Sequence, residues 1–253
     1  MPFSYDEHAP PPALARAVRC FWSLTGAPDA GEGPALNRIL PDNCIDVIFD
    51  LANVRGPNAF IVGPMLKAAV MLHDATVDML GVRFAPGAAT EFLDLRATDL
   101  APADIDASEV WPDAPLIAEQ LASLSRTERL ARFAQYLTTR RRANREAALA
   151  MSTAVLIERA RGAISVASLA RLLSTGERRL QRTFDAAVGI GPKQVIRVAR
   201  FREAAATLSQ PGEISLSRIA LDCGYADQAH FTREFVLLAG VTPTEFRREK
   251  RLV

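Results

Sequence analysis

Two stretches of this sequence carry side chains suited to hydrogen bonding with an extended anionic partner. In the first stretch, Leu180 and Phe184 stand four residues apart, which places both on one face of a helix. The outward positions around this pair are Arg178, Arg179, Gln181 and Arg182. Arginine and glutamine donate hydrogen bonds to phosphates and to the edges of guanine and adenine. This face therefore has the chemistry of nucleic-acid binding.

The second stretch repeats the arrangement with fewer long donors. Phe231 and Phe235 form the inward pair, and the outward positions are Gln228, Ala229, His230, Thr232 and Arg233. Ala229 is short for a contact with a base, so we expect more phosphate contact than sequence discrimination here. For His230, a structural role such as capping a helix is favoured over donation to a phosphate.

Both stretches belong to an internal repeat, in which each unit has the pattern of a helix-turn-helix. The matching pairs are Ser165 with Ser215, Leu169 with Ile219, Ala170 with Ala220, Leu180 with Phe231, Phe184 with Phe235, Gly189 with Gly240 and Pro192 with Pro243. The first three pairs are offset by 50 residues and the others by 51, because the second unit has one more residue in its turn. The turns contain Gly176 and Gly224.

The segment between the units, residues 192–208, reads as one continuous helix of about 25 Å at a rise of 1.5 Å per residue. Successive major grooves on one side of B-DNA lie about 34 Å apart, so a helix of this length can hold two recognition helices over adjacent grooves. We therefore expect double-stranded DNA as the partner. The alternative is a helical protein–protein adaptor, which the salt dependence of DNA binding would distinguish.

A longer motif in the second unit supports DNA binding. It consists of Gly224-Tyr225, His230-Phe231, Arg233, Phe235, Gly240, Thr242-Pro243 and Phe246-Arg247. With this motif, residues 150–250 resemble the AraC/XylS family of bacterial transcription regulators. The resemblance implies a two-headed monomeric DNA-binding module with recognition helices near residues 176–187 and 227–238. Family members commonly have a Ser or Thr helix cap where this chain has Gly176, so we expect the first recognition helix to be less well anchored.

The resemblance also implies roles for particular residues. Base contacts are expected from Arg178, Gln181, Arg182, Gln228, Ala229 and Arg233, and the full set expected at DNA adds Arg179 and Thr232. The core residues Leu169, Leu172, Leu180, Phe184, Ile219, Phe231, Phe235 and Phe246 are expected to pack away from DNA. The function implied is sequence-specific regulation of bacterial transcription.

Charge is divided unequally along the chain. Residues 1–125 contain 7 Lys and Arg against 17 Asp and Glu, whereas residues 126–253 contain 23 against 12. The nets of −10 and +11 indicate that the second half meets a polyanion and that the first half has another task. We expect a β-rich effector-binding or dimerisation domain over 1–125, a helical linker over 126–150 and the double helix-turn-helix domain over 151–253.

The first half predicts an α+β chain whose N-terminal domain is a small barrel or sandwich. Apolar, β-branched runs predict strands at 44–51, 59–63, 67–73 and 77–84, with a short helical or mixed segment at 14–24. From Asp113 onward the apolar spacing predicts helices. Segments 40–51 and 81–89 resemble the amino-terminal domain of a subgroup of AraC-like regulators, although Asn43 stands where that pattern has Gly.

Two charged residues of the first half are candidates for binding a small effector. Asp46 shares a strand face with Asp50, and Arg83 precedes a turn whose backbone N–H groups could bind an anion. The competing interpretation is that the acids are turn or edge residues and that Arg83 pairs with an acid. Trp22 and Trp111 are expected to be packing residues.

Several classes of protein are disfavoured. The sequence has no nucleophile, paired-carboxylate or P-loop motif, so we expect no enzyme, and its scattered Cys and His residues predict neither a metal site nor a cofactor. The longest stretches without Asp, Glu, Lys or Arg have 11 residues, which is too short for a membrane helix. We expect a cytoplasmic, nucleoid-associated protein. A small-molecule effector, a homodimer and, for an activator, RNA polymerase remain open as further partners.

Overall fold

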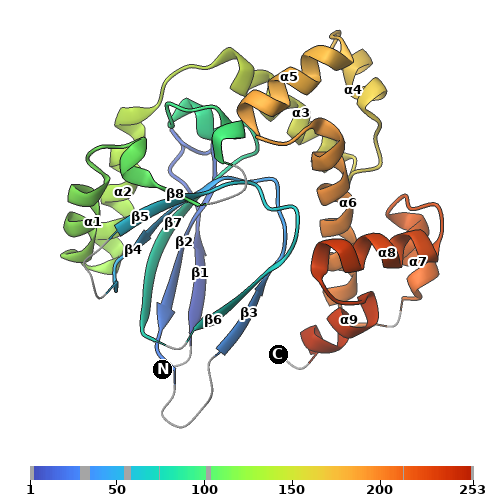
Figure 1. The fold of residues 1–253 in the computed structure, drawn as a ribbon, viewed down its shortest axis with the longest axis horizontal. Coiled ribbons are helices and arrows are strands. Elements are labelled where there is room, and N and C mark those ends of the chain that lie inside the picture. The colour runs from blue at the N-terminus through green and yellow to red at the C-terminus, as the bar shows by residue number, and fades with distance from the viewer. Residues whose placement is uncertain are drawn as a thin grey trace.

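The computed structural model describes residues 3–28, 35–53, 58–73, 75–100, 104–212 and 214–251 of the 253-residue chain. Strands occupy the first part of the chain and helices the rest (Figure 1). A β-rich domain is thus followed by two helix-turn-helix units joined by a long helix. The expected α+β fold class is confirmed.

The β-rich domain is built on antiparallel strands. They are β1 (Ser4–His8), β2 (Val18–Gly26), β3 (Ala35–Ile39), β4 (Asp46–Asp50), β5 (Asn58–Val62), β6 (Ala69–His73), β7 (Val77–Phe84) and β8 (Ile105–Asp106). Six of them form one sheet in the order β1-β2-β7-β4-β5-β8, and β3 pairs with β6 in a separate ribbon. The strands expected near 44–51, 59–63, 67–73 and 77–84 are β4, β5, β6 and β7.

Segment 14–24, expected to be helical or mixed, is instead a turn that leads into β2. β2 lies between β1 and β7, and Cys20, Phe21 and Trp22 are all buried although they alternate between the two faces. Burial on both faces removes the apolar–polar alternation by which a strand is recognised. Gly81 lies opposite Trp22, and a Cβ on it would come within 2.2 Å of the indole ring.

Two helices cover one face of the sheet. They are α1 (Ala114–Ala122) and α2 (Arg126–Arg140), and three short 3-10 turns precede them: η1 (Ala89–Glu91), η2 (Ala97–Leu100) and η3 (Ala107–Glu109). Phe133 of α2 contacts Phe21 and Phe49 edge-on, with ring centroids 5.4 and 5.0 Å apart. α2 falls within the range expected to be a linker, yet it completes this core. The division of the chain at residues 125 and 150 stays a prediction.

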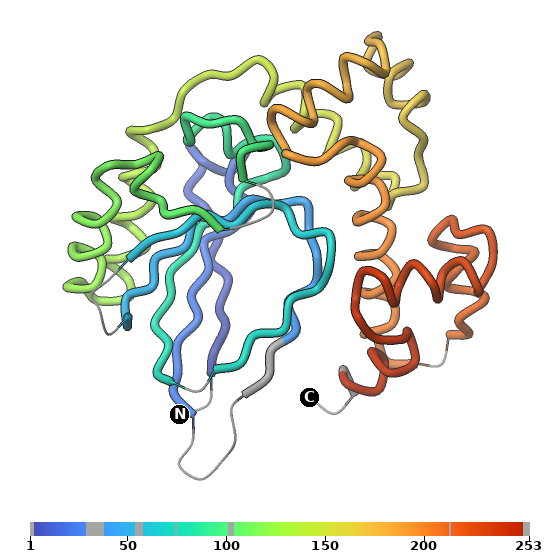
Figure 2. Tube along the Cα trace, in the orientation of Figure 1, coloured from blue at the N-terminus to red at the C-terminus, as the bar shows by residue number. Residues whose placement is uncertain are grey.

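The rest of the chain is helical. Its helices are α3 (Arg145–Arg159), α4 (Val166–Leu172), α5 (Glu177–Ala187), α6 (Pro192–Ser209), α7 (Leu216–Asp222), α8 (Gln228–Ala239) and α9 (Pro243–Arg251). Figure 2 traces α6 between the two units, with α4 and α5 near one end and α7 to α9 near the other. α6 places Val195 in the core of the first unit and Phe201 in the core of the second.

The inward residues expected from the repeat are buried, with one exception. Leu169, Leu180, Phe184, Ile219, Phe231, Phe235 and Phe246 are each at most 1% exposed. Leu172, also expected to pack, is 65% exposed. It is the last residue of α4 and lies about 160° around the helix axis from buried Ala170, so the periodic pattern overestimated the packed face.

Candidate nucleic-acid interface

The first unit consists of α4, a tight turn and α5. The hydroxyl of Ser165 caps α4 by accepting a hydrogen bond from the backbone N–H of Ser168 at 3.1 Å. Ser174 carries the positive φ of the turn, at 48°. Gly176 is the N-cap of α5 and provides no side-chain hydrogen bond, as expected. The start of the first recognition helix therefore relies on its packed residues for anchorage.

The predicted contact residues of the first unit lie on α5 and are exposed: Arg178, Arg179, Gln181 and Arg182. Leu180 and Phe184 hold the opposite side of α5 in the core at 0% exposure. The amide of Gln181 donates to Asp185 at 2.9 Å, and it lies so close to Gly191 that a Cβ there would come within 2.5 Å of it. Gln181 is thus directed along the flank of α5 toward the start of α6.

Arg182 also faces the β-rich domain. It lines a hollow of about 450 Å³ between α5 and the β-rich domain, together with Arg96, Asn144 and Asp185. Arg96 adds a cation beside the predicted contact residues. Sequence reasoning missed it, since Arg96 lies 86 positions before Arg182 and no motif links the two.

The second unit is capped more completely. Ser215 caps α7 by accepting from the N–H of Arg218 at 3.2 Å, and Gly224 takes the positive φ of the turn at 73°. Asp227 caps α8 by accepting from the N–H of His230 at 2.6 Å. The ring of His230 packs edge-on against buried Tyr225, with centroids 5.4 Å apart. These contacts hold the second recognition helix against its turn.

The predicted contact residues of the second unit share one surface. A hollow of about 710 Å³ beside α8 is lined by Gln228, Ala229, Thr232, Arg233 and Val236. Gln228 is oriented by the hydroxyl of Ser217, which donates to its amide oxygen at 2.7 Å. Val236 was not among the predicted residues. It lies four positions after Thr232, so helical spacing alone could have indicated it.

The β-rich domain contacts the helical half at several points. Arg38 of β3 donates to the carbonyl of Ala239 at 3.0 Å and pairs with Glu249 at 3.3 Å. The buried amide of Asn43 donates to the carbonyl of Val195 at 3.1 Å. The start of α6, the end of α8 and α9 are therefore tied to the first half of the chain.

The two residues expected to bind an effector, Asp46 and Arg83, form an ion pair with each other. The guanidinium of Arg83 donates to the carboxylate of Asp46 at 3.0 to 3.2 Å, and Trp22 donates its indole N–H to the same carboxylate at 3.0 Å. Arg83 also lies 3.4 Å from Asp42, which in turn lies 3.7 Å from Arg202 of α6. Arg83 thus pairs with acids, as the competing interpretation expected. An effector role for Asp46 and Arg83 stays a prediction.

Two kinds of feature are absent from the described ranges. There, no group of three or more His, Cys, Asp or Glu side chains is arranged to hold a metal ion. No helix in the same part of the chain has the length and apolar character needed to cross a membrane.

Two family models match the chain. Residues 169–249 match a helix-turn-helix domain, and residues 6–106 match a domain of unknown function, DUF6597. No curated protein matches the chain.

Solved structures of regulators are similar to it. The C-terminal domain of AraT, a response regulator from Geobacillus stearothermophilus, shares 24% identity over 42% of this chain and 88% of its own, with a TM-score of 0.39. A transcriptional regulator with an AraC-type DNA-binding domain from Chromobacterium violaceum shares 27% sequence identity. The match covers 39% of this chain and 89% of that regulator, with a TM-score of 0.37. ToxT from Vibrio cholerae shares 10% sequence identity. The match covers 86% of this chain and 98% of ToxT, with a TM-score of 0.46.

The fold and the match over 169–249 define the class: a β-rich domain joined to a DNA-binding helix-turn-helix domain of the kind used in transcription regulation. The match over 169–249 lies within the range that resembles the AraC/XylS family, and this resemblance is confirmed.

Proposed function

We propose that the protein is a bacterial transcription regulator that binds one specific double-stranded DNA site with both units, in two adjacent major grooves. The observation that carries this proposal is the placement of α5 and α8 near the two ends of α6, each with its polar face exposed. The 18 residues of α6 span about 27 Å, comparable with the spacing of adjacent grooves.

Within this proposal, the two recognition helices have different tasks. α5 carries three exposed arginines and a glutamine, which supply bidentate donors to bases. α8 presents Ala229 and Val236 beside Arg233, a surface that suits the methyl group of thymine and a neighbouring phosphate. We assign most of the sequence discrimination to α5.

The β-rich domain supplies regulation in this proposal. It contacts both helix-turn-helix units, so a small molecule bound to it can change the spacing or mobility of the recognition helices. The proposal also includes self-association, which sedimentation with and without DNA tests. If the protein is an activator, it includes contact with RNA polymerase, which polymerase footprints at a captured promoter test.

The test begins with capture of genomic DNA fragments by the purified full chain. Affinity for a captured site is then measured by fluorescence anisotropy at several salt concentrations. We expect the logarithm of the affinity to fall linearly with the logarithm of the salt concentration, because bound Lys and Arg displace counterions from DNA. Enrichment of no defined sequence, or affinity that does not change with salt, would favour the adaptor alternative.

Single substitutions test the residue assignments on the same site. Arg178→Ala and Gln181→Ala are each expected to weaken binding by about 1–3 kcal/mol and to relax preference at one base position. Arg182→Ala and Arg233→Ala are expected to weaken binding as well. Arg126→Ala, a change of equal charge at an exposed position of α2, serves as the control and should leave the affinity within about twofold. Equal losses in all five variants would contradict the assignments.

A further inference from the structure

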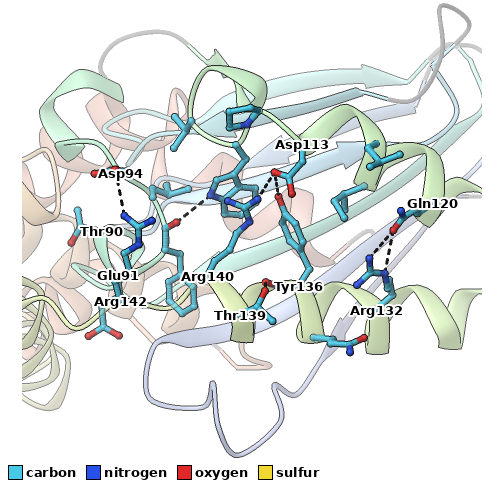
Figure 3. Close-up of a pocket in the computed structure, with 18 residues that line it drawn as sticks. Thr90, Glu91, Asp94, Asp113, Gln120, Arg132, Tyr136, Thr139, Arg140 and Arg142 are labelled. Atoms are coloured by element: carbon cyan, nitrogen blue, oxygen red, sulfur yellow. Dashed lines mark hydrogen bonds and ion pairs between the residues drawn. The ribbon is translucent and has the colours of Figure 1, made fainter.

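A groove on the β-rich domain lies apart from the surfaces proposed for DNA. It has a volume of about 720 Å³ and lies between α1, α2 and the turn that follows η1 (Figure 3). This volume is within the range of sites that hold small organic molecules. None of the predicted effector residues lines it.

One face of α2 forms a wall of this groove. Arg132, Tyr136, Thr139 and Arg140 follow the spacing of residues that share a helix face, and Arg142 lies just beyond the helix end. Figure 3 shows Arg142, Arg140 and Arg132 following one another along the groove. Arg132 and Arg140 are separated by about 12 Å along the helix axis, a distance that their long side chains can shorten.

The central arginine is held in place. The guanidinium of Arg140 lies over the rings of Tyr136 and Trp111, at 4.5 and 5.3 Å from their centroids, and it pairs with Asp113. The hydroxyl of Tyr136 donates to the same carboxylate at 3.0 Å. Stacking and pairing together fix a cation in the floor of the groove without mobile side-chain conformations.

The two outer arginines are weakly paired. Arg132 donates to the neutral amide oxygen of Gln120 at 2.7 and 3.3 Å, and it takes part in none of the ion pairs formed within the described residues. Arg142 lies 3.5 Å from Asp94, and both side chains are largely exposed. Glu91, the remaining acid of the lining, is bound to Arg141 outside the groove at 2.8 Å. The groove therefore has one positive charge in excess.

The wall opposite α2 is apolar near its middle. Leu116, 56% exposed, and buried Ile117 lie on α1 between Asp113 at one end and Gln120 at the other. Cations at both ends and a leucine between them match a molecule with two acidic ends and an apolar middle.

We propose that this groove binds a small dicarboxylate with an aliphatic chain, such as adipate or suberate. One carboxylate is held by Arg132, the other by Arg140 and Arg142, and the methylene groups lie against Leu116. A role in regulation rests on the function proposed above, whereas binding itself does not. The link to the DNA-binding domain is short, because the backbone N–H of Arg142 donates to the carbonyl of Glu91 at 2.6 Å and Asn144 caps α3.

Calorimetry of the full chain with adipate and with suberate tests the proposal. We expect saturable binding of one molecule per chain, with hexanoate, which has one carboxylate, binding about tenfold more weakly because one charged contact is missing. Arg132→Gln is expected to weaken dicarboxylate binding by about tenfold for the same reason. Arg126→Gln, on the same helix but outside the groove, is the control and should bind as the parent does.

Three results would overturn the proposal: no saturable heat with either dicarboxylate, equal losses in Arg132→Gln and Arg126→Gln, or sulfate binding as tightly as adipate. Arg132 lies at the groove edge, so its variant is expected to unfold at the parent temperature, which circular dichroism verifies. Failure to bind DNA would overturn the regulator proposal and leave the calorimetric result standing. If the parent protein binds DNA but no dicarboxylate, only the proposal of a dicarboxylate site in the groove is overturned.

Discussion

At the scale of single residues, the buried pair of Asp46 and Arg83 has an unusual environment. Burial, together with the neighbouring charge of Asp42, raises the pKa of the Asp46 carboxyl to about 6, against the lowering influence of Arg83 and of the hydrogen bond from Trp22. Desolvation of a charged carboxylate thus outweighs its ion pair.

This raised pKa predicts a particular dependence of stability on pH. Between about pH 4 and pH 6 the folded protein holds a proton on Asp46 that the unfolded chain has lost, so the stabilisation from this group falls as pH rises through that window and is constant above it. The change is about 2–3 kcal/mol in total for a shift of this size. Urea unfolding of the parent and of Asp46→Asn at each pH measures it.

The quantity of interest is the difference in free energy of unfolding between parent and Asp46→Asn, since Asn cannot titrate. We expect this difference to change in favour of Asp46→Asn as pH rises from 4 to 6. A difference that stays constant with pH would contradict the raised pKa of Asp46.

At the scale of elements, the two helix-turn-helix units use different residues for the turn and for the cap of the helix that follows it. The positive φ of the turn falls on Ser174 in the first unit and on Gly224 in the second. The helix that follows is capped by Gly176 in one and by the carboxylate of Asp227 in the other. The glycines at 176 and 224 therefore have different roles: Gly176 is an extended cap, and Gly224 is a left-handed turn residue.

Substituting the two turn glycines by serine should have effects of opposite sign. Gly176 has a φ of −91° with no atom within 4 Å of a new Cβ, so Gly176→Ser adds a helix cap and restricts the unfolded chain, for a gain of about 0.5–1 kcal/mol. Gly224→Ser must hold a side chain at a φ of 73° and should lose about 1 kcal/mol. Urea unfolding of both variants measures the difference, and effects of equal sign would refute this account.

At the scale of the whole molecule, the β-rich domain holds the second unit through Arg38. Its guanidinium bonds the carbonyl of Ala239 at the end of α8 and pairs with Glu249 of α9, while the N–H of Ala68 donates to the carbonyl of Leu238 at 2.7 Å. These contacts satisfy carbonyls that a helix end leaves without partners. They also couple the sheet domain to a recognition helix.

We expect Arg38→Ala to loosen the second unit selectively. Loss of about 1 kcal/mol of hydrogen bonding should raise amide hydrogen exchange in residues 228–251 by about fivefold and leave residues 145–187 unchanged. Lys67→Ala, a change of equal charge at an exposed neighbouring position, is the control. Exchange that rises equally in both units, or equally in the control, would show that Arg38 does not act on α8 in this way.

Much of the DNA-binding half could be predicted from its sequence. The repeat of Leu180 and Phe184 as Phe231 and Phe235 determines which faces of α5 and α8 are inward, because helical periodicity is a local property. The strands β4 to β7 followed from runs of β-branched residues for the same reason. β2 did not, since burial on both faces depends on neighbours that are distant in sequence.

Only the tertiary structure decided which distant residues meet. Asn43, a departure from the pattern of the resembling regulators, contacts Val195, and Arg96 lines the same hollow as Arg182. The groove between α1 and α2 likewise depends on how these helices pack on the sheet. Sequence by itself determined strands β4 to β7, the paired helices of the two helix-turn-helix units and most of their inward faces. Contacts between domains required the fold, because they join residues that no local spacing relates.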